Sequence, residues 1–228
     1  MPLIVIEGLD GSGKATNAAM LEQKLKQNGK KVRKISFPDY NSDSSALVKM
    51  YLSGKFGSKP DDVNAYAASA FYAVDRYASY KSVWQSDMQN GTWIIADRYT
   101  TSNAVHQASK LEGKARDDYL DWLYDFEFTK LGLPRPDIVI YLDVFPEISQ
   151  RLIAGRYKGD QTKKDIHEKD TEYLEKSRKT ALYAAKKLGW QVICPCSNGD
   201  MLSPQKAFEL VYNKLKDFYG DKLSQNND

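Results

Sequence analysis

The sequence predicts an α/β fold in which a parallel sheet of about five strands lies between layers of helices. Two observations carry this prediction. Short, continuously apolar runs alternate with amphipathic segments along the whole chain, and such runs are typical of strands buried on both faces of a parallel sheet. The first run is followed at once by a glycine-rich turn and then by a helical pattern. Parallel strands that are joined by right-handed helical crossovers would give both the alternation and this strand–turn–helix order.

The first strand covers residues 3–6, and the turn after it follows the pattern G-x-x-x-x-G-K from Gly8 to Lys14. Glycines let successive backbone N–H groups converge on a phosphate, and the helix N-terminus and the lysine add positive charge. A glycine turn beside a surface lysine is the simpler interpretation, but the flanking strand and helix favour a phosphate-binding loop. Its expected ATP-binding residues are Gly8, Asp10, Gly11, Ser12, Gly13, Lys14, Ala15 and Thr16.

One loop residue departs from the pattern. The position after Lys14 is Ala15, where Ser or Thr usually supplies a hydroxyl to Mg²⁺. Thr16 follows and remains a candidate for contact with an α-phosphate. The sequence therefore predicts a P-loop three-layer sandwich with an unusual metal site.

The next elements follow from periodicity and from their terminators. A helical stripe ends at the Asn-Gly of residues 28–29, and a strand at residues 32–37 is closed by Pro38. Residues 45–52 form a short helix, and a long one is expected from an N-cap at Asp61 or Asp62 to Gln89. The same alternation predicts strands at 92–96, 137–142 and 191–194 and helices at 116–131, 146–155, 171–188 and 203–218. These elements form one domain, residues 1–219, followed by a polar, flexible tail at 220–228.

Polar residues follow several of the predicted strands. The phosphate-binding loop, the pair Asp97-Arg98 and Asp143 all fall at carboxyl ends of strands, where ligands of such sheets bind. Asp97 is the expected Mg²⁺ residue, directly or through water, with Asp143 as the alternative. Arg98 is expected to bind a phosphate. The sequence thus predicts phosphoryl transfer at this edge of the sheet.

A basic segment at about residues 151–169 is a candidate lid. Two glycines there provide hinges, and cations suit closure over phosphates. A solvated charged loop is the alternative. The cations are Arg151, Arg156, Lys158, Lys163 and Lys164.

The composition is that of one globular domain: 228 residues, 42% hydrophobic and 28% charged. A net charge of +3 gives no reason to expect nucleic acid or a membrane as a partner. No apolar run approaches the ~20 residues of a membrane span, and the sequence enters its first strand without a leader pattern. The two cysteines, Cys194 and Cys196, are expected to be reduced thiols, which predicts a cytoplasmic protein.

Taken together, the motifs resemble the thymidylate kinases, a family of P-loop nucleoside monophosphate kinases, over nearly the whole chain. Their order and spacing make the resemblance specific. The matching segments are Ile6-Glu-Gly-Leu-Asp-Gly-Ser-Gly-Lys14, Phe37-Pro38-Asp39, Phe71-Tyr-Ala-Val-Asp-Arg76, Asp97-Arg-Tyr-x-x-Ser102, Gly132-Leu-Pro-x-Pro-Asp137 with Tyr141-Leu-Asp143, and Tyr173-Leu-Glu-Lys-Ser-Arg178.

The resemblance implies a cytoplasmic, homodimeric enzyme that phosphorylates dTMP to dTDP with ATP and Mg²⁺. It implies that Asp10 contacts the sugar 3′-hydroxyl of the acceptor and that Arg98 bridges the donor and acceptor phosphates. Because Ser12 stands in the loop where some members have an arginine, it implies a catalytic arginine in the lid, either Arg156 or, second, Arg151.

The resemblance also implies the acceptor-binding residues. Tyr72 matches the aromatic that stacks on thymine, and Arg76 the guanidinium that hydrogen-bonds the carbonyl edge of the base. Taken alone, Tyr72 would more often be a core residue and Arg76 a surface charge. The implied set is Asp10, Phe37, Tyr72, Arg76, Arg98, Ser102, His106 and Gln107.

Besides Ala15, three residues depart from the family pattern: Tyr40 replaces an arginine, His106 a tyrosine and Phe145 an acidic residue. They leave two alternatives open. One is a kinase for another deoxynucleotide, such as dUMP, or for a deoxynucleoside. The other is a nucleotide-binding regulatory protein with weakened catalysis.

Overall fold

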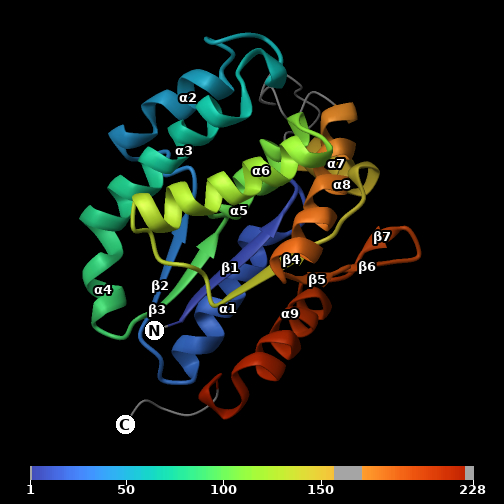
Figure 1. The fold of residues 1–228 in the computed structure, drawn as a ribbon. Coiled ribbons are helices and arrows are strands. Elements are labelled where there is room, and N and C mark those ends of the chain that lie inside the picture. The colour runs from blue at the N-terminus through green and yellow to red at the C-terminus, as the bar shows by residue number, and fades with distance from the viewer. Residues whose placement is uncertain (1, 157–170, 224–228) are drawn as a thin grey trace.

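A computed structural model describes residues 2–156 and 171–223. Its centre is a five-stranded parallel sheet with the strand order β2-β3-β1-β4-β5 (Figure 1). This confirms the predicted parallel sheet. The strands are β1 (Leu3–Gly8), β2 (Val32–Ser36), β3 (Trp93–Asp97), β4 (Ile138–Leu142) and β5 (Gln191–Ile193).

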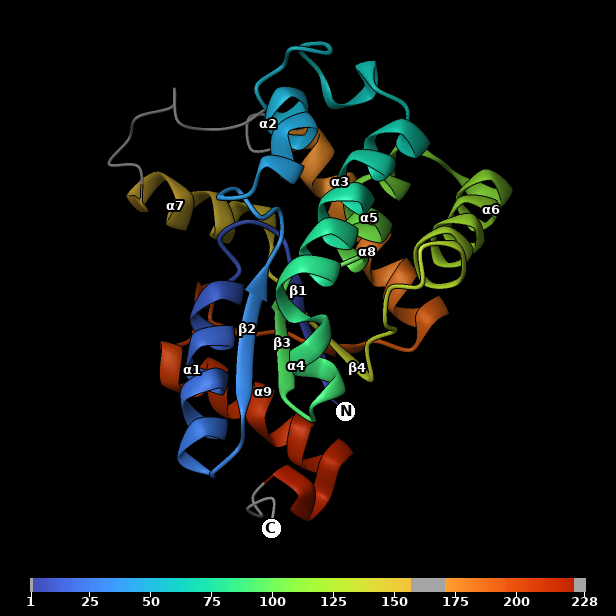
Figure 2. The ribbon, with the colours of Figure 1, turned by 90° about the vertical axis from the view of Figure 1, so that its left-hand side faces the viewer.

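Two helices cover one face of the sheet, α1 (Lys14–Gln27) and α9 (Pro204–Tyr219) (Figure 2). Alternate side chains of a strand point to opposite faces. Ile4 and Ile6 of β1 therefore pack in the cluster that contains Leu21 of α1 and Val211 of α9. The apolar runs predicted as strands form one half of the core in this way.

The opposite face carries a second apolar cluster, which includes Leu3 and Val5 of β1. The helices of this layer come from the middle of the chain and from α8. They are α3 (Ala65–Ser79), α5 (Thr101–His106), α6 (Gly113–Tyr124) and α8 (Thr171–Leu188). Two further helices, α2 (Ala46–Leu52) and α7 (Pro146–Arg156), flank the carboxyl edge of the sheet.

The long helix predicted from residues 61–62 to 89 differs in the structure. Asp62 instead accepts a hydrogen bond from the Lys59 amide in its own 3₁₀ turn, and the N-cap of α3 is Asn64, whose Oδ1 accepts from the Ala67 amide at 2.9 Å. A π-helical turn at Tyr80–Trp84 then separates α3 from α4 (Gln85–Gln89). Asn and Asp cap helices equally well, so residue type alone does not distinguish Asn64 from the predicted Asp61 or Asp62.

Two further segments depart from the expectations. The predicted helix 116–131 begins earlier, at Gly113, and ends in a π-helical turn at Asp125–Lys130. The region after β5 holds a short hairpin, β6 (Cys196–Ser197) and β7 (Asp200–Met201), whose two-residue strands are too short to give a pattern.

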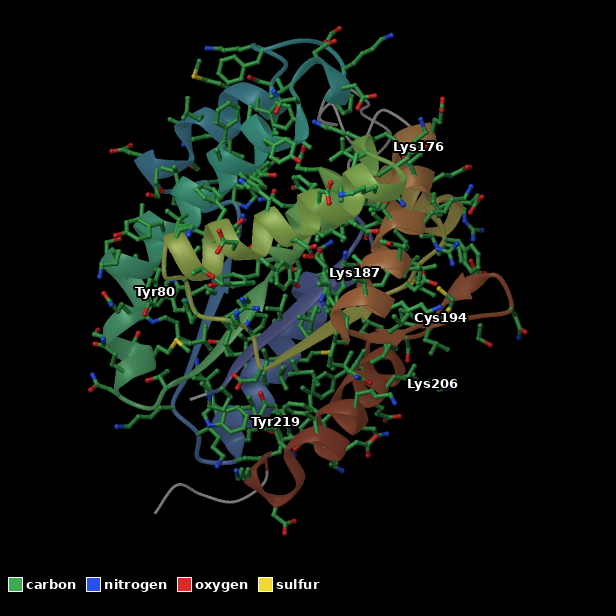
Figure 3. All side chains as sticks on the ribbon, viewed as in Figure 1. Tyr80, Lys176, Lys187, Cys194, Lys206 and Tyr219 are labelled. Carbon is green, nitrogen blue, oxygen red and sulfur yellow. The ribbon has the colours of Figure 1, made fainter. Side chains whose placement is uncertain are left out.

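The structured part of the chain extends past the predicted domain end at residue 219. Gly220–Leu223 forms a 3₁₀ turn, the Leu223 side chain is fully buried, and its carbonyl accepts from Nδ2 of Asn28 at 3.0 Å. Residues 224–228 lie outside the described residues. Both cysteines are free thiols, and Cys194 lies directly after β5 (Figure 3). In the described part of the chain, no helix is both long and apolar enough to cross a membrane.

Candidate active site

The predicted phosphate-binding loop connects the end of β1 to the first residue of α1. Its glycines are required by close approaches of the backbone. A Cβ on Gly8 would lie 2.8 Å from the Leu142 carbonyl of β4, and one on Gly11 would lie 2.6 Å from the Ser149 carbonyl of α7. Gly11 and Gly13 also have positive φ angles of 80° and 85°. The loop is thus packed tightly against two neighbouring elements and holds a fixed shape.

Lys14 lies inside this loop and is only 7% exposed. Its ammonium donates to the Leu9 carbonyl at 2.7 Å and lies 3.8 Å from a carboxylate oxygen of Asp10. Burial, together with repulsion from Arg98, lowers the pKa of Lys14 to about 8. A phosphate group at the loop would stabilise the charged form, so the lysine is suited to bind an anion.

Arg98 connects the end of β3 to the phosphate-binding loop. Its Nη2 donates to Oδ1 of Asp10 at 2.6 Å, while Nη1 lies 3.3 Å from His106 Nε2 and donates to Ser102 Oγ at 3.4 Å. The residue has a positive φ of 69°, which costs a non-glycine residue about 1–2 kcal/mol. Strain of this kind, held in place by several side-chain contacts, is typical of functional sites.

The charges of this cluster reinforce one another. Burial would raise the pKa of Asp10, but Arg98 and Lys14 outweigh it and hold that pKa well below its usual value. Burial likewise lowers the pKa of Arg98, and the carboxylates of Asp10, Glu7 and Asp97 more than reverse this. Asp10 is therefore a carboxylate and Arg98 a cation at every physiological pH.

Glu7 is a member of the cluster that the sequence reasoning missed. It is fully buried at the end of β1. Its Oε1 accepts from the Gly8 amide at 2.9 Å and faces Nη1 of Arg98 at 3.4 Å, while Oε2 accepts from the hydroxyls of Thr101 and Ser102 at 2.7 Å each. This carboxylate joins the loop, Arg98 and α5. A glutamate at the end of an otherwise apolar strand was the available signal.

The predicted metal residues differ in their surroundings. Asp143 accepts hydrogen bonds at both oxygens from Arg178, at 2.7 and 2.8 Å, so a Mg²⁺ ion there would have to replace or share this ion pair. Asp97 is the last residue of β3 and lies near Lys14 and Arg98, where its charge favours the protonated form of both side chains. The described residues contain no group of three metal-binding side chains. Asp97 fits a Mg²⁺ ion held mainly by phosphates and water, as is usual for this ion.

The loop offers few hydroxyl groups for such an ion. Ala15 is exposed at the start of α1. The Ser12 hydroxyl is buried, and a Cβ on Gly8 would lie only 2.5 Å from it. The expected Mg²⁺ site therefore stays a prediction, and of these two positions only Ser12 carries a hydroxyl, which is buried.

Arg76, which is expected to hydrogen-bond the acceptor base, is a buried residue and not a surface charge. It is 1% exposed and forms a bidentate ion pair with Glu127, with Nε donating to Oε2 at 2.7 Å and Nη2 to Oε1. Glu127 also accepts from Thr100 Oγ1 at 2.6 Å and Asn103 Nδ2 at 3.2 Å. The pair fixes the guanidinium plane and leaves Nη1 outside the bidentate contact.

The other predicted acceptor residues fall into two groups. Tyr72, on the same helix as Arg76, is half-buried, with its ring 6.4 Å from that of Tyr51. Phe37 instead packs in the core against Tyr99, at 6.0 Å. Ser102, His106 and Gln107 all lie on or next to α5. The Gln107 side-chain oxygen is buried with no hydrogen-bond partner among the described residues.

The candidate lid is described only at its start. Arg151 on α7 is exposed and donates to the Gly199 carbonyl at 2.7 Å and to Asp200 at 3.0 Å, which joins it to the β6–β7 hairpin rather than to Arg98. The Arg156 side chain and residues 157–170 lie outside the described residues.

Comparisons with known proteins agree with this geometry. A family model described as thymidylate kinase matches residues 6–199. The Mycobacterium tuberculosis thymidylate kinase is 33% identical over 184 residues, 80% of this chain and 84% of that protein. The Schizosaccharomyces pombe thymidylate kinase is 29% identical over 178 residues, 78% and 77% of the two chains. A solved structure of Candida albicans thymidylate kinase has the same fold, with a TM-score of 0.71, 21% identity, and coverage of 100% of this chain and 95% of that one.

Proposed function

Since the chain belongs to the thymidylate kinase family, we propose that it transfers the γ-phosphoryl group of ATP to the 5′-phosphate of dTMP, giving ADP and dTDP. The observation that carries this proposal is the cluster of Lys14, Asp10 and Arg98. It joins a phosphate-binding loop to a cation at the neighbouring strand end. Such a site binds two phosphate groups next to each other, which phosphoryl transfer requires.

The donor phosphates bind at the loop. Backbone N–H groups and the N-terminus of α1 contribute partial positive charge, and Lys14 contributes a full one. In the absence of nucleotide the Lys14 ammonium bonds to Leu9 and faces Asp10. Phosphate oxygens replace these weaker contacts on binding and raise the pKa of the lysine.

Arg98 binds between the donor and the acceptor. Its two terminal nitrogens have different partners: Nη2 bonds to Asp10, and Nη1 faces Glu7, Ser102 and His106. These contacts orient a planar cation at the carboxyl edge of the sheet. The charge that develops on the transferred phosphoryl group is stabilised there without reorganisation of the protein.

A Mg²⁺ ion belongs to this proposal, and Asp97 is the residue that would hold it, directly or through water. When bound, the ion neutralises charge on the donor phosphates. With Ala15 in place of a hydroxyl residue, the ion relies more on phosphate oxygens and water.

The acceptor base binds against Tyr72 and Arg76. An aromatic ring for stacking and a fixed guanidinium at the base edge select a pyrimidine. Buried polar groups without partners disfavour ligands that leave them unpaired, so Gln107 contributes to this choice. Asp10 remains the proposed contact to the sugar, and Arg156 in the lid the proposed additional cation.

The homodimer and the cytoplasmic location remain proposals. Apolar side chains on α3 are exposed and suit an interface between copies: Tyr66, Val74 and Tyr77, at 41, 51 and 40%. The free thiols of Cys194 and Cys196 are compatible with a reducing compartment.

Substitution of the two cations tests the function. We expect Lys14→Ala and Arg98→Ala to lower ADP release from ATP and dTMP by about a hundredfold or more. Lys206→Ala, at an exposed position on α9 (Figure 3), is the matched control and should retain full activity. Transfer at the wild-type rate in the Lys14 variant would contradict the proposed site.

Because Ala15 lacks the usual hydroxyl, a second candidate function is that of a nucleotide-binding regulatory protein. In that case the chain would bind ATP and dTMP, measured by calorimetry, without ADP release in excess Mg²⁺. Turnover by the wild-type chain rules it out.

A further inference from the structure

Strand β2 forms an open edge of the sheet. It is the terminal strand, and β3 is its one neighbour (Figure 2). The Trp93 amide of β3 donates to the Lys31 carbonyl at 2.8 Å, and in a parallel ladder the residues that bond to the neighbour alternate along the strand. No described residue bonds to the backbone groups that point away from β3. These outward groups belong to Val32, Lys34 and Ser36.

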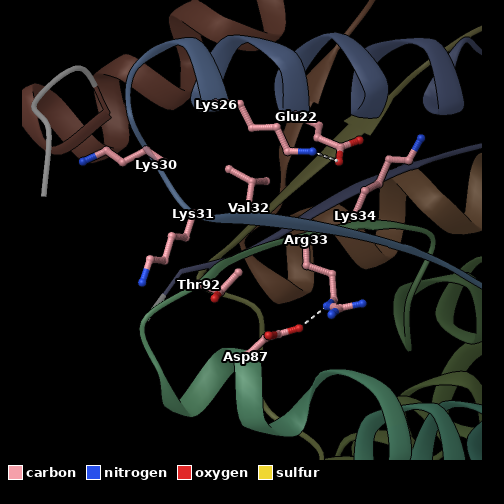
Figure 4. Close-up of a pocket in the computed structure, with 9 residues that line it drawn as sticks. All are labelled: Glu22, Lys26, Lys30, Lys31, Val32, Arg33, Lys34, Asp87 and Thr92. Atoms are coloured by element: carbon pink, nitrogen blue, oxygen red, sulfur yellow. Dashed lines mark hydrogen bonds and ion pairs between the residues drawn. The ribbon is translucent and has the colours of Figure 1, made fainter.

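Two adjoining hollows follow this edge. One, of about 510 Å³, lies between Glu22 and Lys26 of α1, the start of β2, and Asp87 of α4 (Figure 4). The other, of about 340 Å³, runs along the strand toward Asn41 and reaches Val83. Both are lined by Arg33 and Lys34. We call this continuous depression the β2 groove. It is lined by residues 30–36 and 38–41, by Thr92, and by facing residues of α1, α3, the π-helical turn and α4.

The first hollow of the β2 groove is strongly cationic. Its two acidic residues are each already paired, Glu22 with Lys26 at 2.7 Å and Asp87 with Arg33. Lys31 and Lys34 are exposed and have no ion-pair partner among the described residues. Among the residues that line this hollow, neither lysine forms a hydrogen bond or ion pair with another, whereas Glu22–Lys26 and Arg33–Asp87 do (Figure 4). The five cations of this hollow are Lys26, Lys30, Lys31, Arg33 and Lys34.

We propose that the β2 groove binds an extended acidic segment of a partner protein, which adds to the sheet as a sixth strand. The outward N–H and C=O groups of β2 supply main-chain hydrogen bonds, as in other cases of strand addition. Side chains of an added strand alternate between the two faces. On β2, Lys34 and Val32 lie on the face that α1 covers, and Arg33 lies on the opposite face. Acidic side chains of the added strand that lie on the α1 face would contact Lys34, and side chains on its other face would contact Arg33.

The charge pattern selects the partner. A second copy of β2 would bring its own lysines against those of the first, which is unfavourable for directly opposed residues. Lysines on an edge strand thus prevent self-association and still attract a strand of opposite charge. A nucleic acid would also be attracted, but its backbone has no alternating row of donors and acceptors to pair with the strand.

A binding assay with defined peptides tests the proposal. The probe is a fluorescent peptide of alternating glutamate and valine, about as long as β2, measured by anisotropy with the full chain. Two comparison peptides replace the glutamates by glutamine or carry N-methyl groups on every second amide, in either register. We expect saturable binding of the probe, and binding at least about tenfold weaker for both comparison peptides, because one lacks the charge and the other the backbone donors.

Charge-reversed variants locate the binding surface. Lys31→Glu with Lys34→Glu should weaken probe binding by at least about tenfold, because the net charge at the start of the β2 groove changes by four units against an acidic peptide. Lys179→Glu with Lys186→Glu on α8 makes the same change in net charge at exposed positions and should leave binding unchanged. Kinase activity of both variants reports that the fold is retained.

Several results would overturn the proposal. These are no saturable binding of the probe, equal loss in both double variants, or equal affinity for the N-methylated peptide. Tighter binding of a thymidine oligonucleotide than of the probe would assign the groove to nucleic acid instead.

Discussion

The substitution Glu7→Gln tests how Arg98 is positioned. Glutamine has the shape of glutamate and lacks its charge. If its nitrogen replaces Oε2, it can donate to the hydroxyls of Thr101 and Ser102, which reorient to accept, while the remaining oxygen still accepts from the Gly8 amide. The one contact that is necessarily weakened is the hydrogen bond that Nη1 of Arg98 donates to Oε1 of Glu7 at 3.4 Å, because the acceptor loses its charge.

The size of the effect follows from that contact. A hydrogen bond to a charged group is about 1–2 kcal/mol stronger than one to a neutral group, and here it fixes the orientation of Arg98. We therefore expect kcat to fall by about 5- to 30-fold. The KM for ATP should change less, because Lys14 and the loop amides, which bind the donor, are not altered. Thermal stability should fall little, because the variant no longer buries a carboxylate.

Steady-state kinetics with dTMP and ATP, together with a thermal melt, measure both effects. Glu175→Gln, at an exposed position on α8, is the matched control and should behave as wild type. An unchanged kcat in a stable Glu7→Gln protein would refute the role given to this carboxylate. A large loss of stability with unchanged kcat would assign Glu7 to folding alone.

Three other substitutions or conditions have defined outcomes. Arg76→Ala should lower the free energy of unfolding in urea by about 3–5 kcal/mol, because Glu127 is left buried without its partner; a loss below about 1 kcal/mol would contradict the ion pair. ATP affinity, measured by calorimetry, should weaken as pH rises through about 8, where Lys14 loses its proton. The affinity falls with rising pH because the protonated lysine is the form that binds phosphate. An ATP affinity that stays constant up to pH 10 would contradict the role of Lys14. Ala15→Ser should retain or raise kcat and lower the Mg²⁺ concentration needed for half-maximal rate, whereas an inactive variant would mean that the loop does not face the ion.

Local patterns predicted the parts of the fold that depend on neighbouring residues. The apolar run of β1, the glycines after it and the stripe of α1 lie within one continuous stretch, and all three occur where expected. The elements that differ are those with competing local signals. Asn64 displaced Asp61 and Asp62 as the cap of α3, and π-helical turns interrupt two helices that periodicity alone reads as continuous.

The chemistry of the site was less accessible, since its contacts join residues far apart in the sequence. Arg76 pairs with Glu127 across 51 positions, and Arg98 meets Glu7 across 91. Nothing near Arg76 in the chain distinguishes such a buried pair from a surface arginine. Asp97 and Asp143 have the same local setting after a strand, and only the tertiary contact with Arg178 separates them.

The most direct test of the proposed function is an acceptor panel for the wild-type chain. ADP release from ATP would be coupled to NADH oxidation, with dTMP, dUMP, dCMP, dAMP and thymidine as acceptors, each with excess Mg²⁺ and with EDTA. We expect the highest kcat/KM for dTMP and no turnover in EDTA. Equal or faster turnover of another acceptor, or no ADP release with dTMP and Mg²⁺, would contradict the proposal.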